Sequence, residues 1–257
     1  MHANTIWPQP NRIPRWAGIT TLIPSYFAAM ALGFPWRLNV NRLYARALLK
    51  TLGIRCHIHG NLPKTSSLLV SNHVSWLDPF LCAQLGKVSF VTSTDTLRDP
   101  LLGSITRCAG CQFVSRKALD VQQELEAMKR SHSAGTHLAI YPEGTSGNGL
   151  NLLPFRSSFF EVAMQRNMPV QPIALRWNKE VAHYYGDMSF GPHLAQIVAS
   201  QGLEATIEFL PLLYPQDFAD RKGICAASAK SIANSNTIKT RFEPYPNIDT
   251  LDCFHAT

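Results

Sequence analysis

Apolar and polar positions alternate along most of this chain in a way that predicts strands followed by helices. Short apolar runs rich in branched residues favour strands, and the segments between them carry apolar residues at helical spacing. The predicted strands are Ile54–His59, Ser67–Val70, Val88–Val91, Gln112–Val114, His137–Tyr141, Val170–Arg176 and Thr206–Leu210. The predicted helices are Pro79–Leu85, Leu97–Cys108, Asp120–Ser133, Ser158–Arg166, His193–Ser200 and Asp217–Asn234. This alternation predicts an α/β fold in which helices cover a mixed β-sheet.

The N-terminal part of the chain has a different pattern. No charged residue occurs between Trp16 and Trp36, although Pro24 and Pro35 interrupt this stretch. At about 1.5 Å per residue it is long enough to cross a bilayer, but its hydrophobicity is modest. Three interpretations stay open: a single crossing, a Pro-kinked segment lying in the membrane interface, or a signal peptide ending near residues 29–31. We favour membrane attachment without a crossing.

The next predicted helix, Leu38–Leu52, has an apolar face and a basic face carrying Arg42, Arg46 and Lys50. It suits either a helix lying on a membrane or an ordinary helix packed on the core. Basic residues follow the uncharged stretch more often than they precede it, so a crossing would leave the rest of the chain on the cytoplasmic side. The predicted organisation is a flexible leader (1–15), an apolar membrane-associating helical segment (16–53), an α/β domain (54–235) and a tail (236–257).

The amino-acid composition limits the classes of partner that the protein is expected to bind. The 257 residues carry a net charge of +7 and a pI of about 9.2, with 46% hydrophobic and 16% charged residues. A basic surface attracts anionic lipid head groups, an acidic carrier protein or nucleic acid. No arginine-rich run or aromatic ribonucleoprotein motif supports nucleic acid, which we therefore do not expect as a partner.

The six cysteines are scattered through apolar surroundings, and only Cys108 and Cys111 form a C-x-x-C pair. An apolar, strand-like run follows this pair, unlike the helix that opens after a redox pair. No second pair or H-x-x-x-H completes a zinc site. We expect free thiols, and neither a metal nor a redox cofactor.

The segment from Asn72 to Asp78 offers the clearest chemistry. His73 follows the apolar run of a predicted strand, and Asp78 precedes Pro79, as an N-cap residue precedes the first position of a helix. A turn could bring the two side chains together. A neutral imidazole can then take a proton from a hydroxyl while the carboxylate fixes its tautomer. The same pattern also fits a surface loop whose Asp caps a helix.

Three further blocks follow in order, and together the four carry a family resemblance. They are Asn72–Asp78, Gly110–Arg116, Tyr141–Ser146 and Met168–Ile173. In this order and at these separations they resemble the glycerolipid acyltransferase family, whose type member acylates 1-acylglycerol-3-phosphate. The resemblance covers about residues 66–177. It implies an enzyme in which His73 is the general base and Asp78 orients it.

The resemblance also implies roles for the other blocks. Arg116 would hold the phosphate of the acceptor, because a guanidinium suits bidentate contact with phosphate. Glu143 could bond to an acceptor hydroxyl, while the loop beginning at Gly144 and Thr145 could bind an anion or the oxyanion. The fourth block would line an acyl pocket; a buried core strand explains it equally well.

The third block departs from the family's commonest form, since Ser146 stands where an arginine is usual. This weakens the case for a phosphate-bearing acceptor, although Arg156 could supply a charge instead. The main expectation is transfer to 1-acylglycerol-3-phosphate, giving phosphatidate. The segments 143–147 and 153–156 also resemble enzymes that acylate lyso-ornithine lipid. A non-catalytic lipid-binding protein and a thioesterase are the alternatives from other classes.

The resemblance implies partners as well. The acyl donor would be acyl-coenzyme A or acyl-carrier protein, the acceptor a lysolipid, and the protein would work at a membrane surface with its catalytic domain facing the cytoplasm. A signal peptide is the least favoured reading of the N-terminal stretch, because it would carry the enzyme away from activated acyl donors.

Overall fold

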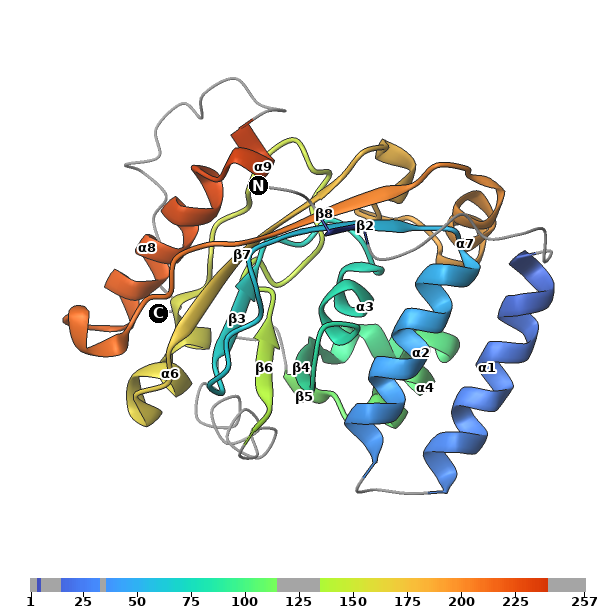
Figure 1. Cartoon of the computed structure of the whole chain (residues 1–257), viewed down its shortest axis with the longest axis horizontal. Helices are drawn as coiled ribbons and strands as arrows, with labels where there is room; N and C mark the ends of the chain where they lie inside the picture. The colour runs from blue at the N-terminus through green and yellow to red at the C-terminus, as the bar shows by residue number, and fades with distance from the viewer. Residues whose placement is uncertain (1–3, 6–14, 33–35, 115–134, 240–257) are drawn as a thin grey trace.

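The computed structural model describes residues 4–5, 15–32, 36–114 and 135–239 (Figure 1). Its centre is one mixed sheet with the strand order β1-β2-β8-β7-β3-β6-β4-β5. The strands are β1 (Asn4–Thr5), β2 (Arg55–His59), β3 (Leu68–Ser71), β4 (Val88–Ser93), β5 (Gln112–Val114), β6 (His137–Ile140), β7 (Val170–Trp177) and β8 (Glu204–Phe209). The mixed, helix-covered sheet predicted from the sequence is confirmed.

Strand direction determines which loops meet. Strands β7, β3, β6, β4 and β5 are neighbours and run parallel to one another. Strand β8 is antiparallel to β7, and β2 is parallel to β8. The segments that leave β3, β4, β5 and β6 therefore start from one edge of the sheet, which is where open α/β sheets place ligands.

Helices cover both faces of the sheet, with α1 to α4 on one side in Figure 1 and α6, α8 and α9 on the other. The α-helices are α1 (Arg15–Ala31), α2 (Arg37–Thr51), α3 (Asp78–Ala83), α4 (Pro100–Ala109), α6 (Glu161–Arg166), α7 (Phe190–Ala199), α8 (Arg221–Ala233) and α9 (Asn236–Lys239). Short 3-10 helices are η1 (Thr94–Arg98), η2 (Ser157–Phe160), η3 (Glu180–Ala182) and η4 (Pro215–Asp217). The predicted helix Asp120–Ser133 lies outside the described residues.

An apolar core lies on each face of the sheet, because successive residues of a strand point to opposite faces. Along β3, Leu69 joins the core beneath α1, α2 and α3, whereas Leu68 and Val70 join the core beneath α6 and α8. Strand β6 repeats the pattern, with Ala139 on the first face and Ile140 on the second. Central strands buried on both faces read as unbroken apolar runs, which is why the sequence marks them clearly.

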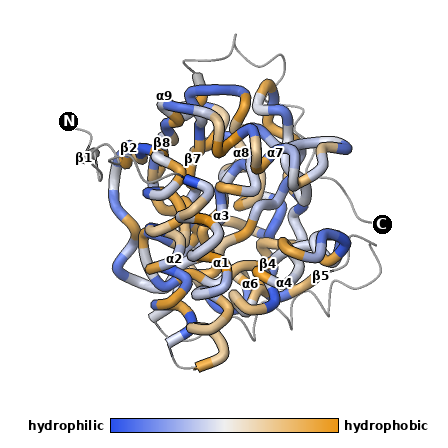
Figure 2. Tube along the Cα trace, turned by 90° about the vertical axis from the view of Figure 1, so that its right-hand side faces the viewer, coloured by the Kyte–Doolittle hydropathy of each residue, from blue (hydrophilic) through white to orange (hydrophobic). Residues whose placement is uncertain are grey.

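The N-terminal helices pack against this domain. Ile19 of α1 and Leu49 of α2 belong to the first core, and Arg15 donates to the carbonyl of Val198 over 3.1 Å. In the described part of the chain, no helix is long and apolar enough to cross a membrane. Hydrophobic and hydrophilic residues are mixed along the two helices (Figure 2).

The structure describes short elements within both predicted terminal segments. The segment predicted as a flexible leader contains β1, which pairs antiparallel with β2, and Arg15, the first residue of α1. The segment predicted as a tail begins with α9, which packs on β7 and β8. Its Ile238 is buried, and the Thr237 amide donates to Glu208 over 2.9 Å. The folded part therefore reaches at least Lys239.

Candidate active site

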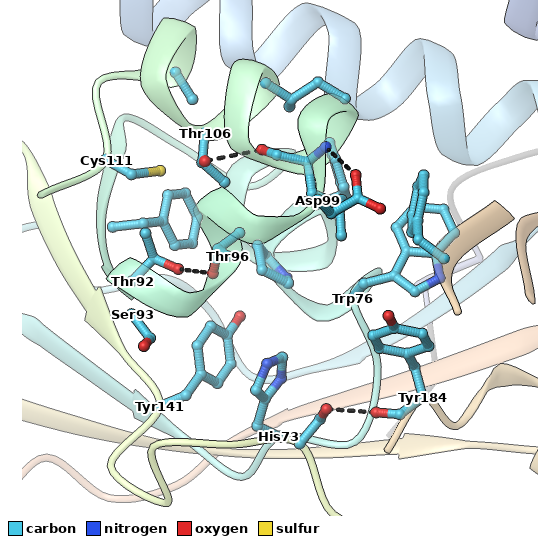
Figure 3. Close-up of a pocket in the computed structure, with 18 of the residues that line it drawn as sticks. His73, Trp76, Thr92, Ser93, Thr96, Asp99, Thr106, Cys111, Tyr141 and Tyr184 are labelled. Atoms are coloured by element: carbon cyan, nitrogen blue, oxygen red, sulfur yellow. Dashed lines mark hydrogen bonds between the residues drawn. The ribbon is translucent and has the colours of Figure 1, made fainter. Parts of the chain in front are cut away.

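A cavity of about 560 Å³ opens at the edge where the parallel strands end. Its walls include His73 after β3, Ser93 at the end of β4 and Tyr141 after β6 (Figure 3). Helices α1, α2 and α4 contribute further wall residues, and the wall as a whole is largely apolar.

The loop that follows β3 is fixed by its own backbone and side chains. The Asn72 amide group pairs with the backbone of Leu175 on β7, donating over 2.9 Å and accepting over 2.8 Å, as a further strand residue would. The His73 amide donates to Glu143 over 2.7 Å, and the His73 carbonyl accepts from Gly147 over 2.8 Å. His73 is thus tied to the loop after β6.

His73 and Asp78 meet directly. His73 Nδ1 lies 2.9 Å from Asp78 Oδ2, which also accepts from the amides of Val74 (2.8 Å) and Ser75 (2.9 Å). Asp78 is fully buried, and the His73 side chain is 19% exposed. A carboxylate held in this way fixes the imidazole with its proton on Nδ1, so that Nε2 is the nitrogen able to accept a proton.

The structure corrects how Asp78 reaches this position. The sequence predicts it as the N-cap of the next helix, but the cap is Leu77 and Asp78 is itself the first residue of α3. Its carboxylate turns back to the amides of the preceding loop, because the loop curls around it. Asp78 Oδ1 accepts from the indole N–H of Trp177 over 2.8 Å, which holds the carboxylate from the far side.

Tyr141 supports the imidazole ring. The rings of His73 and Tyr141 stack with their centroids 4.3 Å apart and an interplanar angle of 25°. Burial raises the pKa of Tyr141 well above its usual value, so its phenol stays neutral beside the imidazole. The stack fixes the plane of the ring without adding charge.

Glu143 joins two loops. Its Oε1 accepts from the His73 amide and its Oε2 accepts from the Leu153 amide over 2.9 Å. Burial raises the pKa of Glu143 to about 8, against the opposing effect of these two amides. Glu143 is not among the residues that line the cavity described above. Its predicted contact with an acceptor hydroxyl stays a prediction, and the geometry favours a role in positioning His73.

The other predicted site residues divide into two groups. Gly144 and Thr145 line the cavity, together with Ser146 and Arg156. Gly144 adopts a φ of +70°, which a glycine tolerates best. Arg156 passes beside Gly144 with its guanidinium 5.5 Å from the Phe159 ring centroid. Arg116 lies outside the described residues, so its predicted phosphate contact stays a prediction.

Two side chains that hold His73 and Asp78 in place could not be identified from the sequence. Trp177 is the last residue of an apolar strand, and Tyr141 opens the third block, so both read as core. Their contacts depend on neighbouring parallel strands, which no local pattern encodes. No disulfide joins the described cysteines to one another, and burial raises the pKa of Cys111 to about 12. Among the described residues no cluster of metal-ligating side chains occurs.

Comparisons with known proteins place this geometry in a family. A family model described as "Acyltransferase" matches residues 53–176. A lyso-ornithine lipid O-acyltransferase of Rhodobacter capsulatus is 29% identical over 219 residues, covering 80% of this chain and 79% of that protein. A 1-acyl-sn-glycerol-3-phosphate acyltransferase of Neisseria meningitidis is 27% identical, covering 68% of this chain and 72% of that protein. The family model and these named relatives support the resemblance to the glycerolipid acyltransferase family that the four sequence blocks carry.

The fold of this acyltransferase also has a solved counterpart. The crystal structure of the 1-acyl-sn-glycerophosphate acyltransferase from Thermotoga maritima matches with a TM-score of 0.60 and 16% identity. The match covers 85% of this chain and 90% of that one. At this identity the likeness concerns the fold alone, and the acyltransferase chemistry follows from the family.

Proposed function

We propose that this acyltransferase moves a fatty acyl group from an acyl thioester to the hydroxyl of a lysolipid, with His73 as general base. The observation that carries the proposal is the contact between His73 and buried Asp78 at the wall of a largely apolar cavity. The imidazole is held by a carboxylate on one side while its ring borders the space where substrates would bind.

The reaction needs no nucleophile on the enzyme. The lysolipid oxygen attacks the thioester carbonyl carbon while His73 Nε2 takes the hydroxyl proton. The tetrahedral intermediate collapses as the carbon–sulfur bond breaks, and the imidazolium returns the proton to the departing thiolate. Asp78 stabilises the imidazolium that exists between these two transfers.

The apolar wall suits an acyl chain. Leu22, Leu48 and Leu101, from α1, α2 and α4, contribute to it together with neighbouring apolar residues. Removing an acyl chain from water gains about 0.8 kcal/mol per methylene. Such a cavity can therefore supply much of the binding energy of the acyl donor, acyl-coenzyme A or acyl-carrier protein.

For the acceptor we propose lyso-ornithine lipid. The relative from Rhodobacter capsulatus is named for that substrate, and Ser146 replaces the arginine that the family commonly places in its third block. The second candidate is 1-acylglycerol-3-phosphate, which the sequence alone favours. The relative from Neisseria meningitidis, named for that substrate, supports it.

Labelled acyl-coenzyme A and acyl-carrier protein, offered with each acceptor in liposomes, test the proposal. We expect His73→Ala to reduce transfer roughly 10²- to 10⁴-fold, the usual contribution of a general base. His59→Ala is the matched control, because His59 is exposed on β2 away from the cavity, and should leave the rate unchanged. Transfer that persists in His73→Ala would remove His73 from the chemistry.

A further inference from the structure

An aromatic wall bounds one side of the cavity, formed by Trp76, Tyr184 and Phe190. The rings of Trp76 and Phe190 meet edge to face with centroids 5.0 Å apart. Figure 3 shows Trp76 and Tyr184 across the cavity from Tyr141, with the imidazole of His73 between them. The wall is therefore in reach of a substrate that contacts the imidazole.

Hydrogen bonds fix the wall to the His73 loop. The indole N–H of Trp76 donates to His193 Nδ1 over 2.9 Å, and His193 Nε2 donates in turn to the His183 carbonyl over 2.9 Å. The Tyr184 amide donates to the Val74 carbonyl over 2.8 Å. The Ser146 hydroxyl donates to the Tyr184 carbonyl. Ser146, at the departure from the family's usual arginine, thus helps to hold the wall in place.

Asp99 places a negative charge beside this wall. Its Oδ1 caps α4 by accepting from the amides of Leu101 (3.0 Å) and Leu102 (2.9 Å), while the carboxylate lines the cavity. Burial, and after it the negative charge of Asp99, raises the pKa of Tyr184, as expected where the two side chains line one cavity. The capping bonds use one carboxylate oxygen and leave the charge in the cavity.

A carboxylate and aromatic rings that line the same side of a cavity can together attract an ammonium group. The carboxylate supplies the opposite charge, and the ring faces add the attraction between a cation and the π system. The same carboxylate repels a phosphate monoester. The other acidic residue that lines the cavity, Asp95, is paired with Arg98 at 3.2 Å, whereas no ion pair joins Asp99 to a cation in the described part of the chain.

We propose that Asp99, Trp76 and Tyr184 form a subsite for the ammonium group of the acceptor headgroup. The inference rests on the proposed acyl transfer to lyso-ornithine lipid and names how that acceptor is recognised. An ornithine whose α-nitrogen is acylated keeps a cationic δ-ammonium and an anionic carboxylate. The ammonium binds at Asp99, and Arg156 beside Gly144 is a cavity-lining cation that suits the carboxylate; the other cavity-lining arginine, Arg98, is paired with Asp95.

The test uses a variant that removes the charge and keeps the cap. Asn caps helices as well as Asp does, so Asp99→Asn should preserve α4. Asp220→Asn is the matched control, because Asp220 caps α8 through two amides at 2.9 Å away from the cavity. Each variant is assayed with lyso-ornithine lipid, with its analogue carrying a hydroxyl in place of the δ-ammonium, and with lysophosphatidate.

We expect Asp99→Asn to raise KM for lyso-ornithine lipid roughly tenfold or more, with kcat nearly unchanged, since a charged hydrogen bond contributes about 1.5–3 kcal/mol. Wild type and Asp220→Asn should both prefer the ammonium acceptor over its hydroxyl analogue, whereas Asp99→Asn should lose this preference. The rate of acyl transfer to lysophosphatidate by Asp99→Asn should equal or exceed that of the wild type.

The possible results distinguish a failure of the ammonium subsite from a failure of the proposed function. Transfer to lyso-ornithine lipid with equal discrimination in wild type and Asp99→Asn would overturn the subsite and leave the function standing. Wild-type transfer to lysophosphatidate alone would overturn both the subsite and the proposed acceptor, while leaving acyl transfer intact. No transfer to any lysolipid by the wild-type enzyme would overturn the proposed function itself.

Discussion

Two buried carboxyl groups that bond to His73, one at its imidazole and one at its backbone amide, have different surroundings. Asp78 contacts the imidazole and accepts three further hydrogen bonds, from two amides and an indole. Glu143 accepts only two amide hydrogen bonds, and burial raises its pKa to about 8. Environments that differ in this way let one carboxylate orient the imidazole while the other ties loops together.

The raised pKa of Glu143 predicts a stability that depends on pH. The carboxyl group ionises at about 4.5 in the unfolded chain and at about 8 in the folded protein. Between these values the unfolded state binds fewer protons, so the contribution of Glu143 to the free energy of unfolding is full below pH 4.5 and falls until about pH 8. Glu143→Gln removes this titration.

Urea unfolding of the wild type and of Glu143→Gln between pH 4.5 and pH 8 checks the direction of this pH dependence. The free energy of unfolding of the wild type should fall relative to that of Glu143→Gln as pH rises, and the difference should level off above pH 8. Thiols and phenols cancel in the comparison, because both proteins carry them. Parallel stability curves for the two proteins would show that Glu143 has an ordinary pKa.

At the scale of elements, the contact between α1 and α2 shapes the apolar wall. A Cβ placed at Gly18 of α1 would collide with the Thr51 methyl group at the end of α2. The glycine lets the two helices approach closely, so that Ile19 and Ala45 are buried between them and the core. Close packing of this kind leaves little room for an added methyl group.

We therefore expect Gly18→Ala to destabilise the protein by about 1 kcal/mol, although alanine is the better helix former. In a Thr51→Ala background the collision disappears, and the same change should stabilise by up to about 1 kcal/mol. Thermal unfolding of the wild type, the two single variants and the double variant gives the coupling free energy between positions 18 and 51. Gly191→Ala in α7, where nothing lies within 4 Å of an added Cβ, should not destabilise. If Gly18→Ala changes the stability equally in both backgrounds, the collision with the Thr51 methyl group is not its cause.

The strands and the central helices could be predicted from the sequence because their signals are local. Strand β5 occupies the predicted residues Gln112–Val114, and β7 extends the predicted strand by one residue, to Trp177. The role of Trp177 could not be predicted, since its indole meets Asp78 across the sheet, 99 positions away in sequence. Asp99 and the aromatic wall were missed for the same reason: each residue has an ordinary local explanation, as a helix cap or a core ring.

At the scale of the whole molecule, large apolar side chains remain exposed on the N-terminal helix pair. Leu32 (88% exposed) and Trp36 (66%) lie between α1 and α2, and Leu43 (64%) lies on α2. These helices also wall the cavity, and α2 carries Arg42 and Arg46, which both reach the Gln84 carbonyl at the end of α3. We propose that this face rests on the membrane, which would bring lipid substrates to the cavity.

Binding to vesicles tests this placement. Replacing both Leu32 and Leu43 with Ser should weaken binding to anionic vesicles roughly tenfold or more, because each leucine loses the gain of leaving water. The matched control replaces Leu150 (52% exposed) and Tyr214 (41% exposed) with Ser, away from the helix pair, and should leave binding unchanged. Acyl transfer to a lysolipid dispersed in detergent should survive in both double variants, since neither touches the cavity wall. Equal vesicle binding by the two variants would move the membrane contact to another face of the enzyme.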